Sequence, residues 1–471
     1  MTTNGRDARS LTSGDIVPTA ALSIVAAAIV WFIVSPMFSA EFGVIDDYQI
    51  ASVLGGSNRL ELTAILPGLA TWLEQDSARF RPLWWVFRIS EAALWGSNPG
   101  GWYLDRLLLA GVTVISTAAL AARYAARPIA VVAGLLVLVG LQSEAWYRLG
   151  TQETYGVPLL MGGLALIAWG RIGLGLLFAV LATLTKEAFV PMAALAVAWT
   201  VYLGHRRRAV LGGLAVAAAG LAVLATWLSA GEPLQQTRSP LAIGSELKWM
   251  AWEAAVVTLW PVFAVVLVLL DRRLTLLVLS ITAAIVLPQA ILDVGLREGR
   301  YMLPAALGAV LITISGLARL TSRSRALSVF ATLVVLLATV SAATAQSRSA
   351  ESRAADSRAF QAGVTAVREA LASRPGAVLV VRPADVFDFE PLISLRAYLP
   401  DGIAVFLPPP KRPDPQAFAV ALYDSMVEAS AAGGLGYQAW NDPSDCVEAD
   451  LRVSLPRICE VAITITGWDT P

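Results

Sequence analysis

Long apolar runs recur along the first three quarters of the chain, and they constrain its fold more than any other feature. Each approaches the roughly 20 residues that a helix needs to cross a bilayer, and short charged connections separate them. Of the 471 residues, 56% are hydrophobic and 15% are charged, which excludes an ordinary soluble class. The predicted fold class is an all-α polytopic membrane bundle of about eleven transmembrane helices. The predicted spans are residues 16–38, 102–121, 127–141, 153–169, 171–185, 188–203, 209–229, 251–270, 274–292, 302–319 and 326–345.

The distribution of basic residues predicts the orientation of this bundle. With the N-terminus inside, the cytoplasmic connections are short and almost purely basic, as in "RYAARP", "GHRRR" and "DRR". The other face receives the long, chemically mixed loops, including a first outer loop at residues 39–101. The preference for arginine over lysine is typical of a GC-rich bacterial genome. We therefore expect a multi-pass protein of the bacterial inner (plasma) membrane with a cytoplasmic N-terminus.

The chain changes character after the last predicted span. Residues 1–345 form the predicted transmembrane catalytic domain, and residues 346–471 the predicted extracytoplasmic domain. In the latter, "AFQAGVTAVREALAS" predicts an amphipathic helix and "GAVLVV" a buried strand, which together indicate a small α/β domain. Both cysteines, Cys446 and Cys459, lie there. An oxidising compartment favours a disulfide between them, and two buried thiols are the alternative.

The first outer loop contains two charged segments with apolar stripes at helical spacing, "RLELTAILPGLATWLEQD" and "RFRPLWWVFRISEAALWG". Such stripes predict juxtamembrane helices that lie in the interface plane and do not cross the membrane. The tryptophans Trp84, Trp85, Trp95 and Trp102 are expected to form an interfacial belt, with a sugar-stacking platform as the alternative. For Arg81 and Pro82, a helix start with a headgroup-binding arginine and a functional arginine are both open.

Ionisable residues gather on the predicted outer face. Asp46 and Asp47 follow the first span directly, where an N-cap of a following helix is the alternative to catalysis. Lys186 and Glu187 occupy a tight turn between two short spans, where charge is rare and functional by default. A mutual ion pair that holds the turn is the alternative for them. The other outer loops contribute Glu144, Arg148, Glu153, Arg297 and Arg300.

Carboxylates and cations on one face of a membrane bundle suit transfer of a sugar from an anionic lipid carrier. Such a transfer needs a carboxylate that removes the acceptor's proton, a role for Asp46 or Asp47. It also needs cations that stabilise the departing phosphate. The candidates for this role are Arg148, Lys186, Arg297 and Arg300, although headgroup anchoring is the alternative for the last two. Glu144 and Glu153 are candidates for orienting these cations or an acceptor hydroxyl.

Four stretches resemble the GT-C superfamily of integral-membrane glycosyltransferases. They are "DDY", "RFRPLWWVFRISEAALWGSNPGGWYLDRLLLAG", "LATLTKEAFVP" and "REGRYMLPAALGA". The second is similar to the "YRPL…LFGxNPxGYHLxNxLLH" pattern of transmembrane O-mannosyltransferases and their bacterial relatives, although the final histidine and the repeat domain of those enzymes are absent here.

The resemblance implies an inverting transfer from a polyprenyl-phosphate sugar, with Asp46 or Asp47 as the base. It also places Arg81, Glu187 and Tyr301 among the substrate-orienting residues, through the "RPL", "TKE" and "GRYMLP" matches. We expect no cofactor; an Asp-Asp pair is able to bind a divalent metal, but a monophosphate donor does not imply one.

The expected partners are a polyprenyl-phosphate sugar donor and an extracytoplasmic acceptor, which is a cell-envelope glycan, a lipid or a protein; no nucleic acid is expected. A transporter or flippase of lipid-linked saccharide is the alternative, although it predicts charges buried mid-span and internal symmetry that the sequence does not display. A non-catalytic scaffold for envelope assembly is a third possibility. The sequence identifies neither the sugar nor the acceptor.

Overall fold

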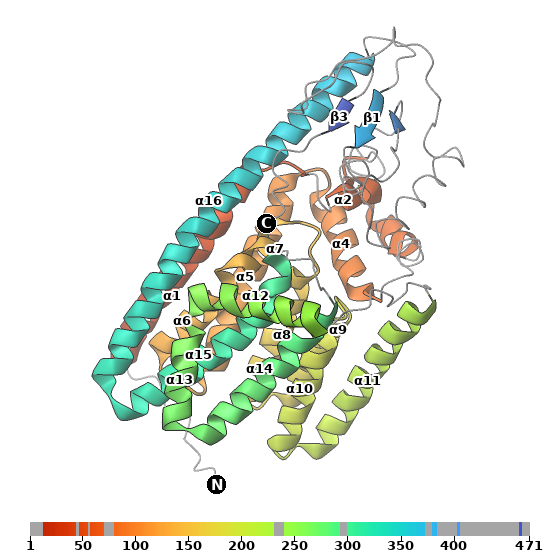
Figure 1. Ribbon diagram of the computed structural model, residues 1–471. Helices are drawn as coiled ribbons and strands as arrows, with labels where there is room; N and C mark the ends of the chain where they lie inside the picture. Colours follow the sequence, from red (N-terminus) through yellow and green to blue (C-terminus); the bar gives the residue numbers. More distant parts are fainter. Residues whose placement is uncertain are drawn as a thin grey trace.

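The computed structural model describes residues 13–43, 47–54, 57–69, 80–229, 240–292, 299–372, 379–383, 403–405 and 461–463. Four of the predicted site residues, Asp46, Arg297, Cys446 and Cys459, lie outside these ranges, and so does the predicted disulfide. The described part of the chain is dominated by helices, which agrees with the predicted class (Figure 1).

Helices account for nearly all the secondary structure of the described residues. The α-helices are α1 (Ser13–Val34), α2 (Tyr48–Leu54), α4 (Pro82–Trp95), α5 (Pro99–Ala122), α6 (Arg127–Leu138), α7 (Glu144–Tyr147), α8 (Glu153–Ala168), α9 (Ile172–Thr183), α10 (Phe189–Tyr202), α11 (Arg206–Ser229), α12 (Pro240–Thr258), α13 (Trp260–Leu270), α14 (Arg272–Leu292), α15 (Leu303–Arg323) and α16 (Arg325–Ala372). Short 3-10 helices are η1 (Ser35–Ser39), η2 (Leu62–Ala64), η3 (Leu141–Ser143) and η4 (Gly299–Met302).

The helices make this a multi-pass membrane protein. Among the described residues, five helices are long and apolar enough to cross a membrane, or up to seven if each of two bent helix pairs is one span. Four shorter apolar helices accompany them: Ile24–Ser39, Glu153–Ala168, Ile172–Thr183 and Phe189–Tyr202. The eleven predicted ranges therefore all fall on helical segments, but the count of eleven spans stays a prediction.

One predicted span is broken. Residues 251–270 do not form a straight helix, because α12 and α13 meet at Leu259 with a bend of 87°. Leu259 has a left-handed backbone conformation, with φ at 55°, and Pro261 lies in the first turn of α13. Proline lacks the amide that would continue the helix, so the ladder of hydrogen bonds ends here. A second bend, of 68°, separates α6 from the segment Leu141–Tyr147.

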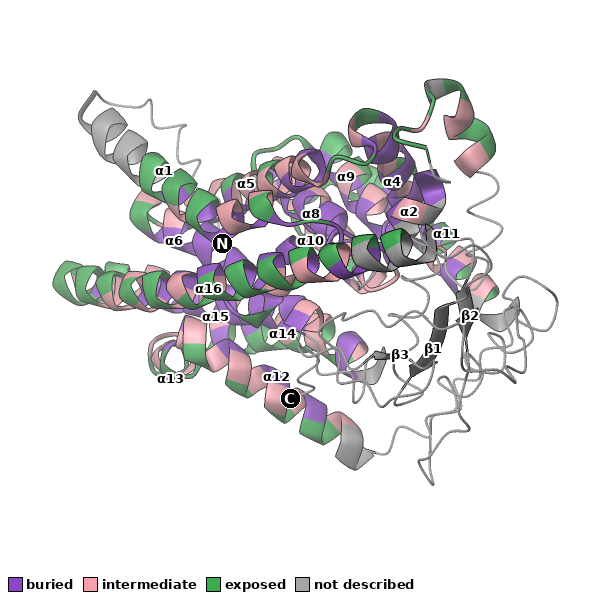
Figure 2. Ribbon diagram, turned by 90° about the horizontal axis from the view of Figure 1, so that it is seen from above, coloured by how far each residue is buried: buried purple, intermediate pink, exposed green. Residues whose placement is uncertain are grey.

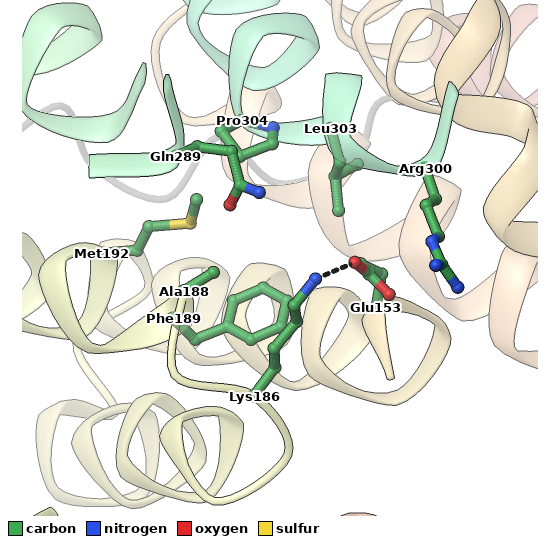
Figure 3. A pocket seen from close by; sticks show the side chains of 9 residues that line it. All are labelled: Glu153, Lys186, Ala188, Phe189, Met192, Gln289, Arg300, Leu303 and Pro304. Carbon is green, nitrogen blue, oxygen red and sulfur yellow. Dashed lines mark hydrogen bonds and ion pairs between the residues drawn. The ribbon is translucent and has the colours of Figure 1, made fainter. Parts of the chain in front are cut away.

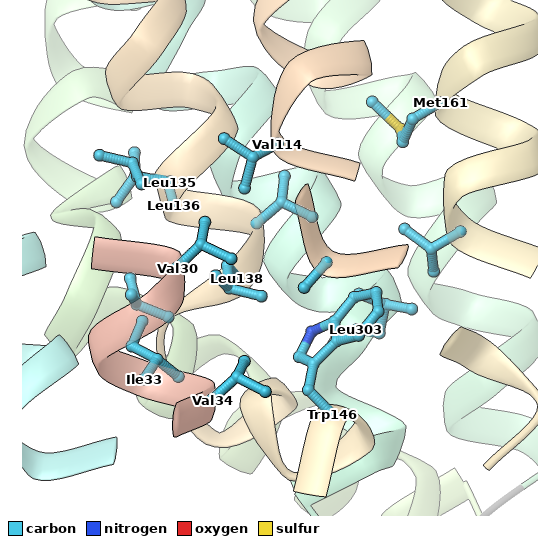
Figure 4. Close-up of a cluster of buried hydrophobic side chains, with 14 of the residues drawn as sticks. Val30, Ile33, Val34, Val114, Leu135, Leu136, Leu138, Trp146, Met161 and Leu303 are labelled. Atoms are coloured by element: carbon cyan, nitrogen blue, oxygen red, sulfur yellow. The ribbon is translucent and has the colours of Figure 1, made fainter. Parts of the chain in front are cut away.

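The core of the bundle is a continuous set of aliphatic and aromatic side chains from helices far apart in the sequence. Val30, Ile33 and Val34 of α1 meet Leu135 and Leu136 of α6 there (Figure 4). Buried positions face the centre of the bundle, and exposed positions run along the outer faces of α1, α11 and α16 (Figure 2). Exposed leucines and valines on the peripheral helices are what a lipid-facing surface requires.

Helix α16 is the longest element, and it extends well beyond the bundle (Figure 1). Its 48 residues correspond to about 72 Å, more than twice the thickness of the hydrocarbon core. The helix continues without a break across residue 345, where the sequence predicts the end of the membrane domain. That domain boundary and the α/β domain remain predictions. Beyond α16, the described strands β1 (Leu379–Pro383), β2 (Ile403–Val405) and β3 (Val461–Ile463) form a parallel sheet in the order β2-β1-β3.

The first outer loop contains the helices α2 and α4, and its tryptophans differ from expectation. Trp84 and Trp102 are fully buried in the protein, and Trp85 is 3% exposed. The predicted interfacial belt is therefore wrong for these three residues. The reason is that α4 packs against α2 and α5, so its aromatic face meets protein instead of lipid.

Candidate active site

Six segments meet at one end of the bundle, which we call the polar end. They are residues 39–43 with 47–54, the start of α4, the segment η3–α7, the turn 184–188, η4 and residues 346–361 of α16. Hydrogen bonds and close contacts link these segments across large sequence separations. The polar end therefore contains the described residues of nearly every outer loop that the sequence analysis singled out.

Asp47 is buried at the polar end and starts helix α2. Its backbone carbonyl accepts hydrogen bonds from the amides of Ile50 and Ala51, which places Asp47 at the N-cap position. Its carboxylate oxygen Oδ2 accepts a bond of 2.7 Å from the amide of Gly43. The cap alternative therefore describes the backbone of Asp47 correctly. The carboxylate itself is held toward the preceding segment, with 4% of the residue exposed.

Lys186 and Glu153 form a buried ion pair that the sequence did not predict as a pair. Their Nζ and Oε1 atoms lie 2.5 Å apart, and their side chains are 8% and 6% exposed. Oε2 of Glu153 is buried with no hydrogen-bond partner among the described residues. The tight turn is thus fixed to α8 through Lys186.

The ion pair lies in a small cleft at this end of the bundle (Figure 3). Arg300 of η4 and Gln289 of α14 contribute further polar groups, and Gln289 is only 3% exposed. The remaining walls are apolar: Ala188, Phe189, Met192, Leu303 and Pro304. The cleft therefore combines an ion pair, an arginine and an amide with aliphatic and aromatic walls.

The ring of Tyr301 lies close to both cations of the cleft. The Lys186 nitrogen lies 4.7 Å from the centroid of its ring, and the Arg300 guanidinium carbon lies 5.0 Å from it. Both distances are within the range of cation–π attraction. The ring therefore holds two like charges near each other at the cleft.

Two glycines allow the close approaches on which this geometry depends. A Cβ atom on Gly156 of α8 would lie 2.1 Å from the ring of Phe189 and 2.5 Å from the Thr185 hydroxyl, so only glycine lets α8 reach the Lys186 turn. A Cβ atom on Gly299 would lie 2.4 Å from the Leu141 carbonyl and 2.6 Å from Glu144 Oε2. Gly299 thus lets η4, with Arg300, pack directly on the segment η3–α7.

Glu144 joins α7 to α16. Its Oε1 atom lies 2.6 Å from a guanidinium nitrogen of Arg148 and 2.5 Å from one of Arg353. Arg148 is therefore engaged by a carboxylate from one turn away. Arg353 lies beyond the range that the sequence analysis considered for the site.

A second buried charge cluster lies between α4, α5 and α8. The Nη2 atom of Arg106 lies 3.0 Å from both carboxylate oxygens of Glu91, and the Tyr155 hydroxyl donates to Glu91 over 2.5 Å. Burial raises the pKa of Glu91, and the charges of Arg106 and Arg88 oppose that rise. Arg106 also donates to the Thr154 hydroxyl, beside Glu153, over 3.1 Å. The cluster thus fixes the first turn of α8, from which Glu153 reaches Lys186.

Arg88 completes this cluster in an unusual environment. It is fully buried, and none of its guanidinium nitrogens has a hydrogen-bond partner among the described residues. The Nη1 atom of Arg88 lies 3.8 Å from Glu91 Oε2. The guanidinium carbon lies 5.6 Å from the ring centroid of Trp84 and 5.3 Å from that of Trp102. The buried tryptophans of α4 and α5 therefore surround a cation.

Comparisons with known proteins give a likeness in fold. The chain is similar to ArnT from Cupriavidus metallidurans, in crystal structures bound to undecaprenyl phosphate and in the apo state. Sequence identity is 14% in both cases, and the TM-scores are 0.48 and 0.49. The likeness covers 89% and 88% of this chain and 91% of each ArnT chain. No family model matches the sequence, and no curated protein matches it.

The structure brings together most of the predicted site residues that it describes. Glu153, Lys186 and Arg300 line one cleft, and the ring of Tyr301 lies close to both of its cations. Glu144 lies beside Gly299, the residue before Arg300, and pairs with Arg148. Arg81 lies at the N-cap of α4, 8% exposed, with its guanidinium carbon 4.3 Å from the Trp84 ring centroid. The amide of Leu83 donates to the Leu184 carbonyl, so the start of α4 contacts the Lys186 turn. Glu187 is half-buried in that turn.

Sequence reasoning missed several polar residues at this end. Arg88 and Glu91 belong to a segment interpreted as an interfacial helix, where charges are expected to face water. Arg106, however, lies inside a predicted span, and a charged residue at such a position is itself a signal of a buried partner. Gln289 offers a weaker signal of the same kind. No local pattern marks Arg353, because its partner is 209 residues away.

Proposed function

We propose that this protein is a membrane glycosyltransferase that moves one sugar from a polyprenyl-phosphate donor to an extracytoplasmic acceptor. The observation that carries the proposal is the cleft at the polar end, where Lys186 and Arg300 lie beside apolar walls. A lipid phosphate offers both an anionic group for the cations and an aliphatic chain for Phe189, Met192 and Leu303. Charged side chains are expensive near membrane depth, so their convergence favours an anionic ligand over a purely structural role.

In this proposal the donor phosphate binds Lys186, Arg300 and Gln289. The ion pair with Glu153 fixes the lysine before the donor arrives, so little side-chain freedom is lost on binding. The free oxygen Oε2 of Glu153 supplies an acceptor for a hydroxyl group of the sugar or of the acceptor. The Glu144–Arg148 pair packs against η4 at Gly299, and the ring of Tyr301 attracts both cations.

The reaction that fits these groups is an inverting displacement. The bond from the sugar C1 to the phosphate oxygen breaks, and the electron pair leaves with the phosphate, whose charge the cations stabilise. The acceptor oxygen forms the new bond to C1 and loses its proton to an aspartate. We assign that base to Asp46 or Asp47. Asp47 offers a buried carboxylate with one oxygen fixed by Gly43, which is the pre-organised state that a general base needs.

The test uses purified protein reconstituted in liposomes with undecaprenyl-phosphate sugars and candidate acceptor glycans, lipids and peptides. Wild type is compared with Asp46→Asn and Asp47→Asn. The matched control is Asp271→Asn, because Asp271 pairs with Arg319 over 2.7 Å at the turn between α13 and α14, away from the polar end. We expect transfer by wild type and the control and loss of at least about 100-fold in one of the two variants.

Two outcomes would contradict the proposal. In the first, both aspartate variants fold normally and transfer sugar at the wild-type rate, so that neither is the base. In the second, the donor lipid crosses the bilayer without formation of a new glycosidic bond, which would make the protein a flippase.

A further inference from the structure

Residues 357–361 of α16 contact the segment that leads to Asp47, although more than 300 residues separate them in sequence. Arg358 donates to the backbone carbonyl and to the hydroxyl of Ser39, both over 2.8 Å. The Ser357 hydroxyl accepts from the amide of Glu41 over 3.0 Å, and the Gln361 amide donates to the Phe42 carbonyl over 2.7 Å. One face of α16 thus binds the backbone at Ser39, Glu41 and Phe42.

The backbone of residues 40–43 belongs to neither a helix nor a strand. Its amides and carbonyls therefore cannot be satisfied by a regular ladder, and buried backbone groups need partners from elsewhere. Side chains of α16 supply them at Glu41 and Phe42. Phe42 is additionally fixed by an edge contact with the ring of Trp102, at 6.4 Å between centroids. The segment is thus held from both sides.

The same segment carries the bond that fixes the carboxylate. The Gly43 amide, next to Phe42, donates to Asp47 Oδ2 over 2.7 Å. A Cβ atom built on Gly43 would lie 3.5 Å from that oxygen and 3.8 Å from Cβ of Ser357. Ser357 is itself buried, at 6% exposure, and its hydroxyl donates to the Ala354 carbonyl. Gly43 therefore lies next to both the Asp47 carboxylate, which its amide binds, and Ser357 of α16.

Helix α16 is in turn anchored to the remainder of the polar end. Arg353 pairs with Glu144 over 2.5 Å, and the Tyr147 hydroxyl donates to the Gln346 carbonyl over 3.1 Å. These contacts fix the height of α16 relative to the segment η3–α7, on which Gly299 and Arg300 pack. A single rigid element thus spans the distance between the candidate base and the cation-bearing elements.

We propose that Ser357, Arg358 and Gln361 are positioning residues for the Asp47 carboxylate. They act through the backbone of residues 39–43 and the Gly43 amide, and they touch neither donor nor acceptor. The inference rests on the proposed function, because it matters for transfer only if Asp47 takes the proton. It assigns a catalytic contribution to residues of the chain that follow the last predicted membrane span.

The test compares Arg358→Ala, Gln361→Ala and the double variant with Arg348→Ala. Arg348 is an exposed arginine of the same helix, ten residues earlier, and serves as the matched control. Three quantities are measured in the full chain: kcat for transfer, the Kd for undecaprenyl phosphate, and hydrogen exchange of the amides of residues 41–47. A displacement of about 1 Å at a reacting group costs about 100-fold in rate, so we expect kcat to fall about 10-fold in the single variants and up to about 100-fold in the double variant.

Positioning predicts a split between these quantities that a structural role does not. The Kd for undecaprenyl phosphate should stay within about twofold of wild type, because the cleft at Lys186 is untouched, and exchange at residues 41–47 should accelerate. Arg358→Lys keeps a donor for Ser39 and should recover most of the rate. The inference is wrong if the double variant keeps the wild-type kcat while Asp47→Asn loses it. It is also wrong if kcat and the melting temperature fall while the Kd rises.

Failure of the proposed function would look different. Wild type would then transfer no sugar, or Asp47→Asn would transfer it at the wild-type rate. In that case the exchange measurement still decides whether α16 holds the segment before Asp47, since it requires no turnover. Unchanged exchange in the double variant would overturn the inference on its own.

Discussion

The buried ion pair between Lys186 and Glu153 allows stability and ligand binding to be separated. Both side chains are less than a tenth exposed, and their charged atoms are 2.5 Å apart. Removing one partner leaves an uncompensated buried charge, which costs about 3–5 kcal/mol of folding free energy. Replacing both by methionine removes both charges, and such exchanges are often neutral. We therefore expect Lys186→Met and Glu153→Met each to destabilise the protein strongly, and the double variant to recover most of the loss.

Affinity for the lipid phosphate should follow a different order. Lys186→Met removes a cation from the cleft, so we expect the Kd for undecaprenyl phosphate to rise at least about tenfold. Glu153→Gln removes a negative charge and leaves the lysine. If the Glu153 carboxylate and a bound phosphate lay about 5 Å apart, they would repel each other by about 3 kcal/mol at an effective dielectric constant of about 20. Glu153→Gln should therefore bind undecaprenyl phosphate more tightly than wild type, although the folded state is less stable.

The assays are reversible unfolding in mixed micelles for the free energy of unfolding and equilibrium binding of undecaprenyl phosphate in detergent. The control is the double variant Asp271→Asn with Arg319→Gln, a pair of which the arginine side chain is 43% exposed. It should change stability by less than about 1 kcal/mol and leave binding unchanged. Two results would refute the reasoning: Lys186→Met with wild-type affinity, or a lysine–glutamate double variant no more stable than either single one.

Three further substitutions follow from close contacts at the polar end. Gly156→Ala should lower the free energy of unfolding by about 1–3 kcal/mol, because its Cβ would collide with Phe189. The control is Gly111→Ala, which should be neutral or stabilising because nothing lies within 4 Å of its added Cβ. Equal effects of the two substitutions on stability would contradict this account. Gly299→Ala should displace η4 from a carbonyl only 2.4 Å from the added Cβ, and so reduce sugar transfer more than stability; a wild-type rate would argue against the cleft. Tyr155→Phe removes the hydroxyl shared by Glu91 and Arg106, and should cost about 1.5–3 kcal/mol in thermal or detergent unfolding.

The sequence predicts the helical bundle well because the bilayer allows few alternatives. A run of apolar residues near span length has to become a helix, so even short elements such as α9 were found. Bends are harder to predict, since they depend on single residues. Pro261 was visible in the sequence, but proline is tolerated inside many membrane helices, and only the left-handed conformation of Leu259 turns it into a break of 87°.

The candidate site was predictable where the signal was local. Lys186 stood out because a charge in a tight turn between apolar helices needs a reason, and Arg300 and Tyr301 because they match a motif. Their partners could not be read in the same way, because Glu153 meets Lys186 across 33 residues and Arg353 meets Glu144 across 209. Such pairs depend on which faces of two helices meet, and that is a property of packing.

The continuity of α16 also affects how the protein can be divided for experiments. A chain cut at residue 345 would retain every predicted span, yet it would lack the side chains that bond to Ser39, Glu41 and Phe42. We expect such a truncated chain to insert into the membrane without the side chains that we propose to position Asp47. A cut beyond the end of α16, at residue 372, would leave those contacts in place. Comparing the two truncations would test the contribution of residues 346–372, and comparing the chain cut at residue 372 with the full chain would show what the chain after this helix contributes.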